Sequence, residues 1–224
     1  MNPIAKRTLT ALLLAALLIG IVVYAPAKWL AVVICIFGTL AVVEFAQLLS
    51  LRCSWPSVGY LVRFVPGMLI LASAFGVLAA ILMKEGNIWL LFIIAIVKIS
   101  DMGGFAFGLA SAKIMRNGNH KLCPAVSPNK SWEGLGGSVF GSCLVGWGFM
   151  PFTNFPFALA TAIACTAAIV GTFGDLVESK FKRWIGVKDS STMKFTNGMG
   201  GVLDMFDSLI FAPAAIWGII LLSR

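Results

Sequence analysis

Long apolar stretches alternate with short charged or Gly- and Pro-containing connections along the chain. Crossing about 30 Å of hydrocarbon takes about 20 residues of α-helix, so each stretch of that length is a candidate membrane span. The first stretch follows Lys6 and Arg7, as a signal peptide would, but its apolar run is long and Ala25-Pro26 offers only a weak cleavage site. We therefore expect an all-α integral membrane protein with seven transmembrane helices, at about residues 8–25, 29–50, 60–83, 87–111, 132–152, 156–176 and 200–222.

The composition supports membrane residence. Hydrophobic residues make up 59% of the chain and charged residues 12%, against roughly 25% charged residues in soluble domains. No polar stretch is long enough to form a soluble domain, so we expect one polytopic membrane domain over residues 1–224. Apolar helices fill residues 1–90, and the residues with candidate chemistry lie between about 95 and 215. The five cysteines are widely spaced and lack a CxxC pair, which indicates packing residues rather than a metal or redox site.

The basic residues predict the orientation. The net charge of +8 does not indicate nucleic acid, because the seventeen Lys and Arg residues lie mostly in short connections between spans. If the N-terminus is cytoplasmic, three basic residues lie on the outer side of the membrane and Lys98 lies within a span. The other thirteen fall inside, namely Lys6, Arg7, Arg52, Arg63, Lys113, Arg116, Lys121, Lys130, Lys180, Lys182, Arg183, Lys188 and Lys194. This asymmetry fits the positive-inside rule. The long connections at about 112–131 and 177–199 then face the cytoplasm, where we expect the active site.

Acidic residues at span ends are the main candidates for chemistry. A charge at the bilayer centre costs roughly 2.5–3.5 kcal/mol on insertion scales, so such residues usually bind ions or pair with bases. Asp204 and Asp207 are three residues apart, which places both carboxylates on one helical face, where together they could hold a divalent cation. Gly200 and Gly201 just before them would let phosphate oxygens approach the backbone at the positive end of the helix dipole.

The end of the sixth predicted span repeats this spacing. Asp175 and Glu178 are again three residues apart, with Lys182 one turn further. One interpretation is structural, in which the acids cap helices or form salt bridges with Lys180, Lys182, Arg183 and Lys188. The other is a site for phosphate transfer, which needs metal ligands, cations and close backbone approach. The combination within one short stretch favours this second interpretation.

The connection at 112–131 contains further candidates. His120 is the only histidine and precedes Lys121; it is either a catalytic group or a solvated loop residue, and alone it makes no metal site. The stretch from Ser127 to Glu133 is typical of a capping box, with Lys130 at the interface. Small-xxx-small patterns predict close helix packing, within one chain or across a homodimer, at Gly134, Gly136, Gly137 and Gly141.

Three blocks of sequence occur in the order seen in a known family. They run from Asp101 to Gly108, from His120 to Gly134 and from Gly174 to Ser208, the last with the acids, Lys188-Asp189-Ser190 and the glycine pair. Together they resemble the signature of the phosphatidate cytidylyltransferases, also called CDP-diglyceride synthetases, over roughly residues 95 to 215. The chain departs from the family pattern at Met199, where a His is common, at Met205, where an Arg is frequent, and by a longer stretch before Gly198.

The resemblance implies a Mg²⁺-dependent transfer of a cytidylyl group from CTP to phosphatidic acid, which gives CDP-diacylglycerol and pyrophosphate. It implies metal binding by Asp175, Asp204 and Asp207, with a second monovalent or divalent cation left open. Further catalytic contacts are implied for Lys182, Arg183 and Lys188. The residues implied in substrate binding are Asp101, His120, Lys121, Ser127, Lys130, Glu178, Ser179, Asp189, Gly200, Gly201 and Ser208.

Other functions stay open beside this one. A CTP-dependent polyprenol or dolichol kinase would move the γ-phosphoryl group to a lipid alcohol. A cation-coupled transporter would place acids near span centres and show paired repeats, whereas these acids gather near span ends and no repeat is visible. A CDP-alcohol phosphotransferase is disfavoured, since its D-G-x-x-A-R block is absent. The expected partners are CTP, phosphatidic acid and the lipid bilayer, without nucleic acid.

Overall fold

The computed structural model describes residues 13, 16–115, 118–187 and 201–223. Residues 16–24 are helical, and the elements that follow are α2 (Ala27–Ser50), α3 (Val58–Glu85), α4 (Asn87–Ile114), β1 (Lys121–Cys123), β2 (Ser127–Ser131), α5 (Trp132–Gly148), α6 (Met150–Thr153), α7 (Phe157–Ile185) and α8 (Val202–Leu222). The predicted helical architecture is confirmed. The β1–β2 hairpin within the 112–131 connection was not predicted.

Five of the described helices, α2, α3, α4, α7 and α8, are long and apolar enough to cross a membrane. Helix α5 is shorter, at 17 residues, and the first predicted span lies partly outside the described residues, so the total of seven remains a prediction. Helix α7 extends beyond its predicted end at residue 176, because no helix-breaking residue occurs before Gly186. That glycine adopts a left-handed conformation and ends the helix.

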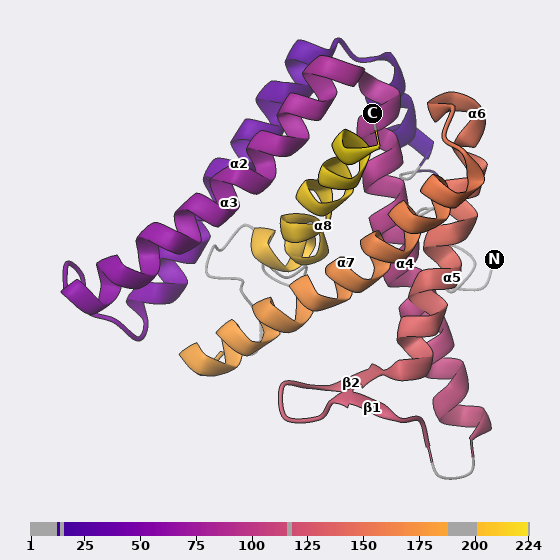
Figure 1. Cartoon of the computed structure of the whole chain (residues 1–224). Coiled ribbons are helices and arrows are strands. Elements are labelled where there is room, and N and C mark those ends of the chain that lie inside the picture. Colours follow the sequence, from indigo (N-terminus) through magenta and orange to yellow (C-terminus); the bar gives the residue numbers. More distant parts are fainter. Residues whose placement is uncertain (1–12, 14–15, 116–117, 188–200, 224) are drawn as a thin grey trace.

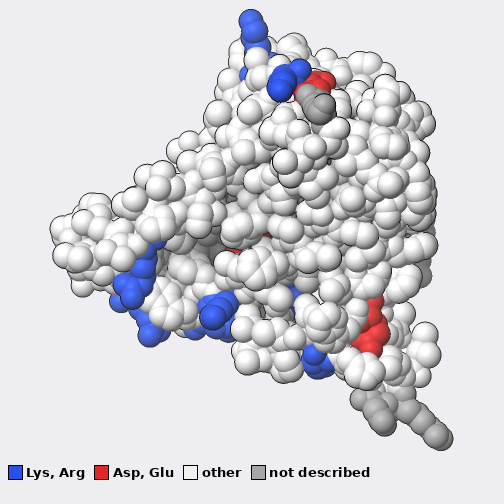
Figure 2. All heavy atoms as spheres, in the orientation of Figure 1, with Lys and Arg blue, Asp and Glu red and all other residues white. Residues whose placement is uncertain are grey.

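Neighbouring helices pack in pairs, α2 with α3, α4 with α5, and α7 with α8. The ends of α2, α4 and α7 lie toward the lower edge of Figure 1, and α8 begins well above the end of α7. Figure 2 shows Lys and Arg side chains near the two ends of the molecule and a largely uncharged surface between them. This distribution is the one that a bilayer requires of a spanning bundle.

The seam between α4 and α5 is built from glycines. A Cβ at Gly137 would lie 2.4 Å from the Cβ of Phe107, and one at Gly103 would lie 2.4 Å from the carbonyl oxygen of Gly137. Gly134 and Gly141 also face α4, whereas Gly136 faces open space. The close packing predicted from the small-residue pattern therefore occurs within one chain for three of its four glycines.

Gly137→Ala is expected to destabilise the fold by about 1–3 kcal/mol, the cost of overpacking a tight contact. Gly136→Ala is the matched control, since it adds the same methyl group where nothing lies within 4 Å. It should be neutral or slightly stabilising, because alanine favours helix over glycine by roughly 0.5–1 kcal/mol. Thermal unfolding in detergent measures both variants, and equal midpoints would contradict the packing described for this seam.

Candidate functional site

Three aspartates from three helices meet at the hydroxyl group of Ser208, a fully buried residue of α8. Its Oγ lies 3.0 Å from both carboxylate oxygens of Asp101 on α4, 2.6 Å from Asp175 Oδ1 on α7 and 3.1 Å from Asp207 Oδ1 on α8. Gly174 permits this approach of α7 to α8, since a Cβ there would lie 2.8 Å from the Asp207 carbonyl oxygen. The Ser208 centre is defined here as Asp101, Asp175, Asp207 and Ser208 with the two neighbouring lysines, Lys98 and Lys130.

The Ser208 centre holds more acceptors than donors. A hydroxyl group carries one hydrogen, so Ser208 donates to one of the three carboxylates at a time. Lys98 Nζ lies 3.4 Å from Asp101 Oδ2, and Lys130 Nζ lies 2.5 Å from Asp175 Oδ2. When all three carboxylates are ionised, the two ammonium groups leave one negative charge uncompensated. An oxygen-rich site with surplus negative charge suits a hard cation.

The donor set fits Mg²⁺ in its chemistry. Among the residues that the structure describes, no three His, Cys, Asp or Glu side chains are arranged to hold a metal ion by themselves. Mg²⁺ commonly keeps several waters and is bound by one or two carboxylates together with substrate phosphates. Asp175 and Asp207, which both contact the Ser208 hydroxyl group, would supply those carboxylates here.

The β1–β2 hairpin brings Lys130 to the centre. The strands are antiparallel, with Lys121 opposite Ser131 and Cys123 opposite Ser127. From β2, Lys130 Nζ also donates to the Thr172 carbonyl oxygen on α7, at 3.3 Å. The hairpin therefore places a cation from the 112–131 connection against an aspartate of α7.

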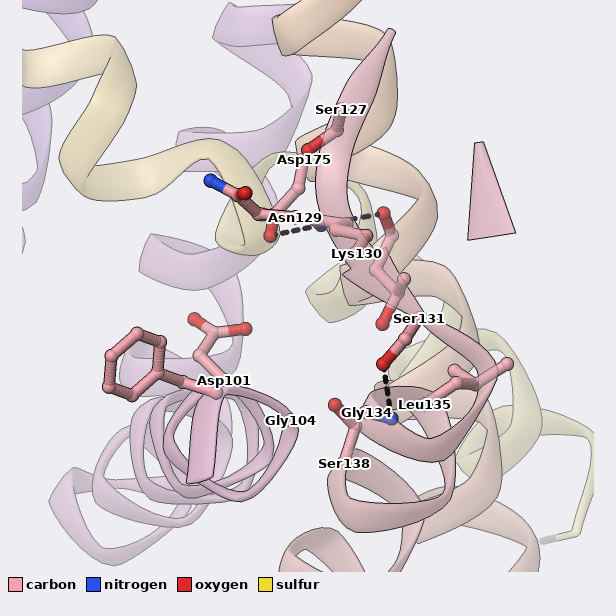
Figure 3. A pocket seen from close by; sticks show the side chains of 12 residues that line it. Asp101, Gly104, Ser127, Asn129, Lys130, Ser131, Gly134, Leu135, Ser138 and Asp175 are labelled. Atoms are coloured by element: carbon pink, nitrogen blue, oxygen red, sulfur yellow. Dashed lines mark hydrogen bonds and ion pairs between the residues drawn. The ribbon is translucent and has the colours of Figure 1, made fainter. Parts of the chain in front are cut away.

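A cavity of about 270 Å³ opens beside the Ser208 centre. Its volume is near the lower limit of roughly 300 Å³ for ligand pockets. Asp101 and Asp175 enter it from α4 and α7 and face Lys130 on β2 (Figure 3). Ser127 and Asn129 line the hairpin side, and α5 closes the cavity with Gly134 and Ser138. Acids, a lysine and hydroxyl groups thus surround a space that can admit part of a phosphate-bearing substrate.

A second group, the Lys182 cluster, consists of Glu178, Lys182 and Asp204. Lys182 Nζ lies 2.8 Å from Glu178 Oε2 and also contacts Asp204. The side chains are mostly buried, with relative exposures of 13% for Lys182, 7% for Glu178 and 19% for Asp204. The salt bridges that the structural interpretation expects are therefore present for Glu178 and Asp204, each with Lys182. Asp175 pairs instead with Lys130.

Protein carboxylates occupy the first turn of α8. Asp204 Oδ2 accepts from the Gly201 N–H at 3.2 Å, and Glu44 Oε2 on α2 accepts from the Leu203 N–H at 2.9 Å. Both contacts place negative charge at the positive end of the helix dipole. Glu44 lies within a predicted span, and no role was predicted for it. In the structure, Glu44 links α2 to the helix that carries Asp207 and Ser208.

Glu44→Leu is expected to lower the thermal midpoint and the activity together, because it leaves the buried Leu203 N–H without its acceptor at a cost of about 1–3 kcal/mol. Glu44→Gln keeps an acceptor of similar shape and should remain close to the unsubstituted protein. Detergent unfolding curves for both variants provide the comparison. If the Leu and Gln variants lost stability equally, the hydrogen bond from the Leu203 N–H would not be the source of the stability that Glu44 provides.

His120 and Lys121 lie at the base of the hairpin, and neither lines the cavity. His120 Nδ1 lies 2.6 Å from Glu133 Oε1, and its backbone N–H donates to the same carboxylate. These hydrogen bonds lower the pKa of Glu133, at the start of α5 and outside the five candidate spans, to about 2. The imidazole is 74% exposed, and its contact fastens the hairpin to α5.

The remaining predicted residues are placed as follows. Asp175, Asp207, Asp101, Ser208 and Lys130 meet at the Ser208 centre, and Ser127 lines the cavity. Asp204, predicted to bind metal with Asp207, contacts Lys182 in the structure, and its metal binding stays a prediction. Arg183 is exposed and donates to the Val187 carbonyl oxygen at 3.4 Å, while Ser179 does not line the cavity. Lys188, Asp189 and Gly200 lie outside the described residues.

Asn129 and Thr172 are among the cavity residues that were not predicted as site residues from the sequence. Asn129 lines the cavity from β2, and Thr172 supplies the carbonyl oxygen that holds Lys130. Asn129 lies in the stretch that was interpreted as a capping box, and Thr172 lies in an apolar run without a charged neighbour, so only the folded arrangement brings them to the site.

The fold and the site define an integral membrane protein that buries paired acids and lysines beside a cavity within a helical bundle. The model of the cytidylyltransferase family matches residues 57–222. The chain belongs to that family.

Curated relatives named phosphatidate cytidylyltransferase are similar to part of the chain. The protein of Staphylococcus saprophyticus is 42% identical over 130 residues, and those of Staphylococcus aureus and Staphylococcus epidermidis are 41% and 40% identical over the same length. Each alignment covers 57% of this chain and 47% of the relative. The chain thus aligns with about half the length of these relatives.

Proposed function

We propose that the protein is a phosphatidate cytidylyltransferase, which transfers a cytidylyl group from CTP to phosphatidic acid. The convergence of Asp101, Asp175 and Asp207 on Ser208 carries this proposal, because it concentrates carboxylates and lysines inside an apolar bundle beside a cavity. Membership of the cytidylyltransferase family and the names of the relatives support the choice of nucleotide and lipid.

In the proposed reaction, a phosphate oxygen of phosphatidic acid attacks the α-phosphorus of CTP. The bond from that phosphorus to the bridging oxygen breaks, and pyrophosphate leaves with the bonding electrons. The attacking oxygen is already anionic at neutral pH, so no general base is required. The main obstacle is repulsion between two phosphate-bearing substrates, which fixed cations reduce.

The lysines and acids divide this work between them. Lys130 would meet phosphate oxygens in the cavity, and Lys98 would add positive charge beside Asp101. Asp101 and Asp175 would hold the two ammonium groups in place before substrate arrives. When bound, Mg²⁺ would supply Lewis-acid stabilisation of the negative charge on the phosphates. Asp175 and Asp207 would hold it, and Asp204 would join them only by leaving Lys182.

The site would face the cytoplasm. The described basic residues Arg52, Arg63, Lys113, Lys121, Lys130, Lys180, Lys182 and Arg183 lie on the side where α2, α4 and α7 end, whereas Lys28 and Lys84 lie at the other side. By the positive-inside rule the first side is cytoplasmic, which is where CTP is available.

Incubation of the detergent-purified full chain with phosphatidic acid, Mg²⁺ and CTP labelled at the α- or the γ-phosphorus tests this function. The proposal predicts that the α-label enters the lipid and the γ-label leaves in pyrophosphate. In a parallel incubation with a lipid alcohol, transfer of the γ-label to the alcohol would identify a CTP-dependent lipid kinase instead. No labelled lipid from phosphatidic acid or from the lipid alcohol would reject both enzymes.

A further inference from the structure

Two arginines that the proposed reaction does not use gather at one tryptophan. The guanidinium carbon of Arg52, just after α2, lies 4.9 Å from the centroid of the Trp184 ring, and that of Arg63 on α3 lies 5.3 Å from it. Trp184 occupies the last turn of α7. Segments far apart in the sequence therefore meet at this ring, which we call the Trp184 site together with the two arginines.

Most hydrogen-bond donors of these arginines have no partner among the described residues. Arg52 Nη1 donates to the Trp184 carbonyl oxygen, and Arg63 Nη1 donates to the Gly59 carbonyl oxygen at 2.8 Å. A guanidinium group has five N–H donors, so each arginine keeps further donors directed elsewhere. Both side chains belong to exposed residues, and within the described part of the chain neither forms an ion pair with a carboxylate. Guanidinium groups that are held in place and still have N–H donors to offer are suited to binding phosphate oxygens.

The surroundings of the Trp184 site are those of a membrane interface. Next to it, the connection between α2 and α3 and the start of α3 expose Trp55, Val58 and Val62, at 64%, 77% and 65%. Phe45 stacks on Phe181, which stacks on Trp184. Aromatic rings with nearby basic residues mark the level of lipid headgroups in membrane proteins. Lys and Arg side chains gather toward the corresponding lower edge of Figure 2.

The Trp184 site is separate from the Lys182 cluster. Trp184 follows Lys182 by two residues, which is a rotation of about 200° around an α-helix. Lys182 turns toward Glu178 and Asp204 inside the bundle, whereas Trp184 turns toward Arg52 and Arg63. A ligand at the arginines would therefore occupy the outer side of α7.

We propose that Arg52 and Arg63 at Trp184 bind the phosphate group of an anionic phospholipid headgroup. The occupant is a lipid rather than a soluble nucleotide, because exposed apolar side chains adjoin the guanidinium groups and match the boundary between headgroups and acyl chains. Bound there, the lipid would hold the ends of α2, α3 and α7 together. The proposal does not depend on the reaction at the Ser208 centre.

Native mass spectrometry of the purified full chain, titrated with phosphatidylglycerol in the presence of phosphatidylcholine, measures this binding. Arg63→Gln is the main variant, since among the described residues Arg63 donates to a carbonyl of its own helix and stacks on Trp184. The double variant R52Q/R63Q removes both guanidinium groups. Lys84→Gln is the matched control, because Lys84 also lies over a tryptophan, at 5.5 Å from the Trp217 ring, but at the other end of the bundle.

R63Q is expected to weaken phosphatidylglycerol binding about tenfold and the double variant further, with Lys84→Gln at the level of the unsubstituted protein. Phosphatidic acid should bind the same site, and excess CTP should displace neither lipid. Unchanged binding in R63Q, an equal loss in Lys84→Gln, or displacement by CTP would each overturn the proposal. Because Arg52 also bonds α7, R63Q alone decides if the double variant does not fold.

Discussion

Asp175→Asn is expected to lower CDP-diacylglycerol formation by at least about 100-fold in a folded protein, the scale on which loss of one electrostatic contact to a transition state is felt. Asp175 contacts both Lys130 and the Ser208 hydroxyl, so an amide there removes the charge that positions the lysine and one carboxylate of the proposed cation site. Turnover with labelled CTP at saturating Mg²⁺ is the measurement.

Glu85→Gln is the control for this substitution. It makes the same kind of change from acid to amide at the end of α3 opposite to the Ser208 centre. Its turnover should match that of the unsubstituted protein. If Asp175→Asn were folded and retained more than a tenth of the turnover, Asp175 would have no direct part in the reaction.

Lys182→Met is expected to destabilise the protein by about 3–5 kcal/mol, because it leaves two mostly buried carboxylates without their cation. The thermal midpoint in detergent should fall even when no substrate is present. The loss concerns the fold, since Lys182 links α7 to the first turn of α8.

The triple variant Lys182→Met, Glu178→Gln, Asp204→Asn tests the cause of that loss. Removing both acids takes away the uncompensated charge, so the midpoint should recover most of the way even though three polar groups have changed. A triple variant that is less stable than Lys182→Met alone would show that the acids contribute through contacts other than the lysine.

Much of the fold follows from the sequence, because apolar stretches of span length leave the chain few alternatives to helices across a membrane. The α4–α5 contact was likewise predictable from small residues at helical spacing. The hairpin was not, since its strands are short and depend on the fixing of His120 by Glu133 and of Lys130 by Asp175. The end of α7 was misplaced because the charged residues after position 176 indicated a connection, whereas Glu178 and Lys182 form a pair one turn apart that supports the helix.

The candidate site was predicted as a set of residues but not as an arrangement. Spacing placed Asp204 and Asp207 on one helical face, yet their different partners depend on where α4, α7 and the hairpin lie around α8. Glu44, Arg52 and Arg63 lie in the N-terminal part of the chain, where no motif marks them. Their roles come from contacts with α7 and α8 more than a hundred residues away, such as the bond from Leu203 to Glu44.

Binding of Mn²⁺ in place of Mg²⁺, followed by electron paramagnetic resonance on the purified chain with CTP present, tests most directly whether carboxylates of α7 and α8 hold a cation. We expect a bound, broadened Mn²⁺ signal in the unsubstituted protein that is lost in Asp175→Asn/Asp207→Asn and kept in Glu85→Gln. An unaltered signal in the folded double variant would contradict this expectation.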